Sequence, residues 1–130
     1  MGKTNKKKKT IRALIKDLDK VFSIWIRQRG MDSRGFNTCF TCGARKHWKE
    51  LQNGHYVSRV HRSLRWDERN CNPQDAACNL FKAGAMDVYA IRLLALYGDN
   101  ILIDLQREKH KVKKWTRMEL ESMLEKYKIV

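Results

Sequence analysis

The residues that follow Thr10 alternate between apolar and polar with a period of three to four positions, as on one face of an amphipathic helix. The apolar positions are Ile11, Leu14, Ile15, Leu18, Val21, Phe22, Trp25 and Ile26. Because glycine commonly ends helices, Gly30 marks the end of this one, and the pattern predicts a helix over residues 11–30. The apolar face is wider than a lone surface helix requires, which makes this helix a candidate dimerisation element.

Apolar periodicity also predicts helices in the last third of the chain. One covers residues 88–97 and ends at Gly98, and a shorter one begins at Ile101. Residues 116–119 read Thr-Arg-Met-Glu, a capping box in which the first and last side chains bond each other's backbone N–H groups at the start of a helix. We therefore expect residues 86–130 to form a helical extension.

In the central part of the chain, apolar and polar residues alternate with a shorter period. Between residues 48 and 60, alternating apolar and polar positions favour two short strands separated by Asn53-Gly54. A helix is then expected to begin near Asp75 and to carry Cys78. Short strands between flanking helices predict an α+β fold, with its central core in residues 31–85.

Composition limits the classes to which this protein can belong. A chain of 130 residues, 42% of them hydrophobic, has room for one ordinary domain. The net charge of +14 favours a polyanionic partner, with nucleic acid as the first candidate. Residues 1–10 contain five lysines and no apolar period, which predicts a disordered basic arm. No apolar run of about 18 residues and no signal-like segment occur, so we expect a cytoplasmic protein without a membrane partner.

The spacing of the cysteines favours a metal site over disulfides. Cys39-Phe-Thr-Cys42, followed by Gly43, has the spacing of a zinc knuckle, in which a tight turn lets two thiolates face one ion. Since no export signal precedes them, reduced thiols are expected.

Three polar residues follow the first cysteine pair in an order that is more informative than any of them alone. His55 lies thirteen residues after Cys42, Asn70 opens the stretch Asn70-Cys71-Asn72-Pro73, and Asn79 comes directly after Cys78. The motifs to compare are Cys39-x-x-Cys42, Gly54-His55-Tyr56-Val57-Ser58-Arg59, Leu64-Arg65-Trp66-Asp67-Glu68-Arg69-Asn70, Pro73-Gln74 and Cys78-Asn79. In this combination the chain resembles the NinG (Rap) family of phage recombination proteins, a branch of the His-Asn-His nucleases. The resemblance runs from about Thr38 to Gly84 and continues more weakly toward the C-terminus.

The resemblance implies a zinc-stapled ββα-metal nuclease core, in which a two-stranded hairpin and a helix hold one divalent cation against the scissile phosphate. In that scheme His55 takes a proton from the attacking water, a role that suits a side chain with a pKa near neutrality. Asn70 would hold the loop and the imidazole in position. Asn79 matches the last metal ligand, and its amide oxygen suits Mg²⁺ or Mn²⁺.

The chain departs from the wider nuclease pattern at two positions. Many His-Asn-His enzymes carry an aspartate ligand directly before the base, where this chain has Gly54, so the second ligand falls to Asn53, to Gln52, or to water and phosphate oxygens.

The second departure lies at the zinc site, where the earlier position of the helix-side pair is Asp75 instead of cysteine. Zn²⁺ accepts thiolate and carboxylate, so Cys39, Cys42 and Cys78 are completed by either Cys71 or Asp75, with the fourth thiolate preferred. Zn²⁺ would be a structural staple, because a small domain with two short strands has little core beneath this loop.

Basic side chains surround the expected active site and are candidates for DNA contacts. They are Arg59, His61, Arg62, Arg65, Arg69 and Lys82. Together these features predict a metal-dependent DNA endonuclease, which the family resemblance directs to branched DNA such as Holliday junctions and D-loops. The missing carboxylate before His55 keeps open an alternative, a zinc-stabilised DNA-binding accessory protein without nuclease activity. An RNA-directed role rests on charge alone.

Overall fold

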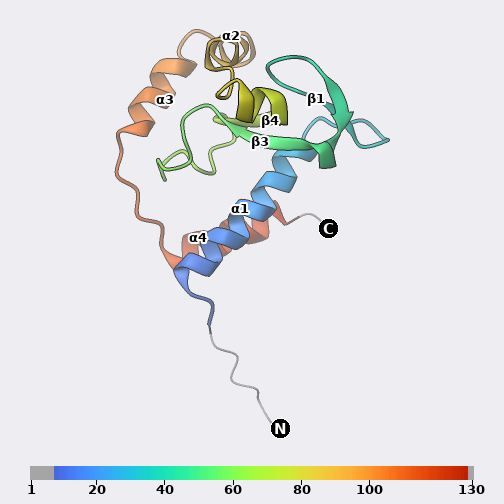
Figure 1. Ribbon diagram of the computed structural model, residues 1–130. Coiled ribbons are helices and arrows are strands. Elements are labelled where there is room, and N and C mark those ends of the chain that lie inside the picture. Colours follow the sequence, from blue (N-terminus) through green and yellow to red (C-terminus); the bar gives the residue numbers. More distant parts are fainter. Residues whose placement is uncertain (1–7, 129–130) are drawn as a thin grey trace.

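The computed structural model describes residues 8–128 and has the mixed α+β architecture that the sequence predicts (Figure 1). In chain order the elements are α1 (Ile11–Gln28), β1 (Phe36–Thr38), β2 (Arg45–His47), the 3₁₀ turn η1 (Trp48–Glu50), β3 (Leu51–His55), β4 (Cys71–Asp75), the π-helical turn η2 (Ala77–Phe81), α2 (Met86–Tyr97), α3 (Ile101–Lys109) and α4 (Arg117–Tyr127). The basic arm predicted for residues 1–10 lies mostly outside the described residues.

The four strands form two separate antiparallel pairs, β1 with β2 and β3 with β4. In the second pair His55 lies opposite Cys71, and Leu51 lies opposite Asp75. The prediction of two strands divided by Asn53-Gly54 is wrong, because both residues lie inside β3. Its partner β4 is missed by the sequence pattern because it contains Pro73 and polar residues, although all five of its residues are buried.

Helix α1 packs lengthwise against α4, which lies beside it in Figure 1. Leu18 and Phe22 of α1 and Leu120 and Tyr127 of α4 belong to one buried cluster, and the ring of Phe22 meets that of Tyr127 edge-on with centroids 4.8 Å apart. The apolar stripe of α1 is therefore covered within the chain. This packing within the chain gives no support to the idea that α1 is a dimerisation element, so self-association stays a prediction.

A second cluster fixes the long loop between β3 and β4. Val57 and Leu64 of this loop pack with Tyr89 and Leu93 of α2 and with Leu105 of α3. The Tyr89 hydroxyl also donates a hydrogen bond of 2.7 Å to the Gly54 carbonyl, which joins α2 to β3. The loop that follows His55 thus has a fixed place relative to the sheet.

The ends of the C-terminal helices follow their local signals. The capping box predicted at Thr116 is present, with the hydroxyl accepting from the backbone N–H of Glu119 at 3.2 Å. Helix α2 ends at Gly98 as expected. None of the helices within residues 8–128 is both long enough and apolar enough to cross a membrane.

Candidate functional site

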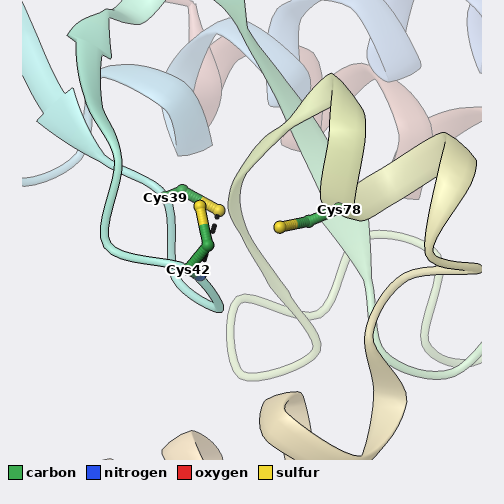
Figure 2. Close-up of side chains that lie close together, drawn as sticks. All are labelled: Cys39, Cys42 and Cys78. Atoms are coloured by element: carbon green, nitrogen blue, oxygen red, sulfur yellow. Dashed lines mark hydrogen bonds between the residues drawn. The ribbon is translucent and has the colours of Figure 1, made fainter.

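Three cysteines from two distant segments converge beside the β3–β4 sheet. The sulfur atoms of Cys39, Cys42 and Cys78 lie within 4.8 Å of one another. Figure 2 shows that the first two come from the loop after β1 and the third from η2, with the sulfurs directed toward a common point. Thiolates at this spacing are the donor set that a tetrahedral Zn²⁺ or another soft ion takes.

The knuckle is shaped by its own backbone. Gly43 adopts a positive φ of 81°, and its N–H donates to the Cys39 carbonyl at 3.0 Å. This turn also lets the N–H of Cys42 approach the Cys39 sulfur at 3.5 Å. Burial raises the pKa of the Cys39 thiol, but N–H donors from Asp75, Cys42 and Thr41 and the Thr41 hydroxyl outweigh burial and lower that pKa to about 7. The turn therefore favours the thiolate that a metal needs.

Neither candidate for the fourth ligand joins the three thiols. Cys71 is fully buried in the packed core, and its sulfur lies 3.9 Å from the Arg65 carbonyl oxygen. The preference for Cys71 as the fourth ligand is therefore corrected, because the fold places this thiol outside the group of three. The carboxylate of Asp75 is also outside the group, because it accepts from the backbone N–H of Ala77 at 3.1 Å and pairs with Lys46 at 3.1 Å. Three protein thiolates thus leave one tetrahedral position for another donor.

His55 lies at the end of β3, and its ring is held by the loop that follows. The Nε2 atom is 2.9 Å from the Arg65 carbonyl oxygen. Since a carbonyl only accepts, Nε2 is the ring nitrogen that carries the proton, and Nδ1 keeps the lone pair. Burial lowers the pKa of His55, and the charges of Arg59 and Arg65 act in the same direction against Asp19 and the Arg65 carbonyl. The ring is therefore held neutral, with Nδ1 as its basic atom.

Asn70 closes the same loop. Its Oδ1 accepts from the N–H of Val57 at 2.8 Å, and its Nδ2 donates to the carbonyls of Val57 at 2.9 Å and Leu64 at 3.2 Å. Because the side chain is fully buried, these bonds have no competition from water. Asn70 thereby fixes the loop that carries the Arg65 carbonyl, and through it the His55 ring.

A cleft of about 510 Å³ is lined by both His55, at the end of β3, and Asn79, in η2. Arg59 and Arg65 of the loop line the same cleft. Its opposite wall is α1, which contributes Arg27 among other residues. The cleft is thus an anion-attracting space beside a neutral, oriented imidazole.

Gly54 is required by close packing across the sheet. A Cβ at this position would come within 1.9 Å of Oε1 of Gln74, a fully buried side chain that donates to Thr41 and to the Gly84 carbonyl. An aspartate or any other residue with a side chain therefore has no room at position 54. The absence of a side chain here follows from the packing of β4 against β3.

The cleft offers amide oxygens to a hard cation. The Nδ2 of Asn79 donates to Oε1 of Gln52 at 2.7 Å, which leaves the Asn79 oxygen as an acceptor. The Oδ1 of Asn53, next along β3, is buried without a hydrogen-bond partner among the described residues. Asn53 and Asn79 both line the cleft, and amide oxygens are ligands that suit Mg²⁺ or Mn²⁺. Within residues 8–128, however, the three thiols are the one cluster of His, Cys, Asp or Glu side chains close enough together to hold an ion.

Among the described residues that line the cleft, one has a carboxylate side chain, Asp19 of α1. It accepts two hydrogen bonds from Arg65, at 2.9 and 2.5 Å, and one from the indole N–H of Trp66 at 2.9 Å. Arg59 approaches it only to 3.8 Å and its side chain stays 60% exposed. Asp19 therefore holds Arg65 in place, while the guanidinium of Arg59 is available to pair with another anion.

The other predicted DNA contacts are distributed more widely. Arg62 lines an adjoining groove, described below, but His61, Arg69 and Lys82 do not line the cleft. Arg69 is bound to Asp67 at 2.8 Å within the loop. Sequence reasoning missed Arg27 and Asp19 because the helix was judged by its apolar face. Their spacing of eight residues, two turns and a fraction, was the available signal for a shared polar face.

Comparison with known proteins relates the chain to bacteriophage proteins. A family model described as "Bacteriophage Lambda NinG protein" matches residues 2–130. Protein ninG of Salmonella phage P22 is 28% identical over 114 residues, which are 87% of this chain and 53% of that protein. Protein ninG of Escherichia phage lambda is 26% identical over 114 residues, again 87% of this chain and 53% of that protein. The chain thus spans about half the length of these curated relatives, and no solved structure matches it.

Proposed function

This chain belongs to the bacteriophage NinG family, and we propose that it is a metal-dependent DNA endonuclease of the His-Asn-His type. One observation carries the proposal. His55 and Asn79 line a single cleft of about 510 Å³ that arginines border on two sides. A neutral base, an amide ligand and fixed positive charge are the parts that metal-assisted hydrolysis of a phosphodiester needs.

In this proposal His55 is the general base. With its Nε2 proton directed to the Arg65 carbonyl, Nδ1 accepts a proton from the attacking water. Asn70 is a positioning residue, since its side chain bonds to the loop and is not among the described residues that line the cleft. The low pKa of His55 keeps the ring in its basic form at neutral pH.

The arginines act on the phosphate. Arg59, which is largely exposed, binds a non-bridging oxygen and stabilises negative charge as it develops. Arg65 contributes charge from a fixed position because Asp19 holds its guanidinium. Arg27, anchored to the Ser23 carbonyl at 3.2 Å, faces the phosphate from α1.

Asn79, with Asn53 or Gln52, would hold Mg²⁺ or Mn²⁺ in the cleft. When bound, the cation supplies charge stabilisation to the phosphate and to the leaving 3′ oxygen. The cysteine trio is proposed to bind Zn²⁺ as a structural ion that joins the knuckle to η2. Family membership directs the activity to phage recombination, with branched DNA such as Holliday junctions and D-loops as substrate.

The test is cleavage of labelled Holliday-junction and matched linear duplex DNA with Mg²⁺, with Mn²⁺ and without divalent metal. Wild-type protein is compared with His55→Ala, and with His47→Ala as a histidine control outside the cleft. Metal-dependent cutting that His55→Ala abolishes and His47→Ala retains supports the proposal. Cutting that survives His55→Ala contradicts it.

A second candidate is a DNA-binding accessory protein without nuclease activity. The hydrogen bond between Asn79 and Gln52 favours it, because two amides bonded to each other need no cation. So does the engagement of Asp19 by Arg65 and Trp66, which leaves the cleft without a free carboxylate among its described residues. This candidate predicts tight DNA binding, no cutting in any metal, and no effect of His55→Ala on recombination.

A further inference from the structure

The cleft continues into a second, larger groove. This groove, of about 810 Å³, is lined by the N-terminal half of α1 and by the loop between β3 and β4. Asp19, Arg59 and Arg65 line both spaces, so the two are contiguous at these residues. The groove also contains Arg12 and Lys16 of α1 and Arg62 of the loop.

One polar face of α1 forms the wall of both spaces. Its members are Arg12, Lys16, Asp19, Ser23 and Arg27, which follow one another at spacings of four, three, four and four residues. That is the period of one helix face, which lies beside the apolar stripe that packs on α4. From Arg12 to Arg27 the wall is about 22 Å long at 1.5 Å per residue.

The charge of this face is strongly positive and unsatisfied. Arg12 and Lys16 are exposed and, like Arg62, make no ion pair with any carboxylate in residues 8–128. Asp19 is the one acidic residue among the described lining of either space, and Arg65 already neutralises it. Such a track attracts a polyanion along its whole length.

The lining chemistry distinguishes a duplex backbone from a single strand. No aromatic side chain is among the described residues that line the groove, so it offers no stacking surface for unpaired bases. Isolated basic groups along a helix suit phosphates, which position a duplex without reading its sequence. A duplex rises about 3.4 Å along its axis for each base pair, so the length of the wall corresponds to about six base-pair steps of a duplex arm.

We propose that the polar face of α1 binds the backbone of a double-stranded DNA arm and leads it from the groove into the His55 cleft. This inference rests on the proposed nuclease function for the position of the cut, but the binding itself does not need catalysis. In this arrangement α1 has two roles: its apolar face packs in the core, and its polar face forms one wall of the DNA interface.

The test measures binding of a labelled duplex of about 30 base pairs by fluorescence anisotropy between about 50 and 200 mM salt. All proteins carry His55→Ala so that the DNA stays intact. The test variant is Arg12→Gln with Lys16→Gln, and glutamine is chosen because it keeps helix propensity. The control is Arg34→Gln with Arg92→Gln, which removes the same charge from exposed positions that line neither space.

The test variant is expected to flatten the slope of log Kd against log salt by about two, because each lost phosphate contact contributes about 0.9. The control is expected to keep the slope of the His55→Ala parent. Equal slopes for test and control overturn the inference.

A separate outcome distinguishes this inference from the proposed function. If the wild-type protein cuts no DNA but the test variant still flattens the slope, the α1 interface stands and the nuclease proposal fails. If the wild-type protein cuts DNA while Arg12→Gln with Lys16→Gln leaves both the slope and KM unchanged, the nuclease stands and the α1 interface is wrong.

Discussion

Replacing Asn70 by alanine tests the arrangement of the loop that carries the His55 partner. The change removes three hydrogen bonds, to the N–H and carbonyl of Val57 and to the Leu64 carbonyl. Each bond contributes about 1 kcal/mol net, and the groups left behind are buried and lose access to water. We therefore expect the free energy of unfolding to fall by about 3 to 4 kcal/mol, a large part of the roughly 5–15 kcal/mol of a typical domain.

Urea unfolding followed by circular dichroism, with Zn²⁺ present, measures this loss. Asn100→Ala is the matched control, since Asn100 is exposed and its side chain caps no helix N–H, and it should cost under about 0.5 kcal/mol. Trypsin cleavage in the arginine-rich loop should accelerate in Asn70→Ala alone. A loss within about 1 kcal/mol of wild type, with unchanged proteolysis, would refute the role given to Asn70.

Three further predictions test other parts of the structure. Gly54→Ala displaces Gln74 from its two buried hydrogen bonds and should cost about 2–3 kcal/mol in urea unfolding; an equal cost in a Gln74→Ala background would show that the two do not interact. Cys78→Ser should weaken Zn²⁺ binding in a chelator competition, whereas Cys71→Ser should leave the bound Zn²⁺ unchanged, and the reverse result would restore Cys71 as a ligand. The bond from Lys113, followed by those from Thr116, lowers the pKa of Glu119 to about 2. Since this folded pKa lies below the ordinary value, the stabilisation is present above about pH 4.5 and is lost as pH falls toward 2; Glu119→Gln should remove this pH dependence from thermal melts while keeping the capping box.

The helices could be predicted from the sequence because their signals are local. The apolar period of α1, the capping box of α4 and Gly98 at the end of α2 each act within a few residues. Strand β4 could not be predicted, since Cys-Asn-Pro-Gln-Asp has low strand propensity and forms a strand only by pairing with β3. The predicted separation of two strands at Asn53-Gly54 was wrong for another reason: Gly54 lies inside β3, where the absence of a side chain allows the close approach of Gln74.

The candidate site was partly visible in the sequence. The order of motifs placed His55, Asn70 and Asn79 in one region, and the cleft brings His55 and Asn79 together. The spare thiol of Cys71 was misassigned because counting cysteines says nothing about which strand face each one occupies. The contribution of α1 was missed because its polar face meets the cleft only through tertiary packing.

The account is tested most directly by single-turnover cleavage of a Holliday junction by wild-type and His55→Ala protein in Mg²⁺, with binding measured on the same samples. Loss of a general base should slow the chemical step by at least about 100-fold while the Kd for DNA stays nearly constant. Equal cleavage rates, or binding without any cleavage by the wild-type protein, would contradict the assignment of His55 as the base of a nuclease.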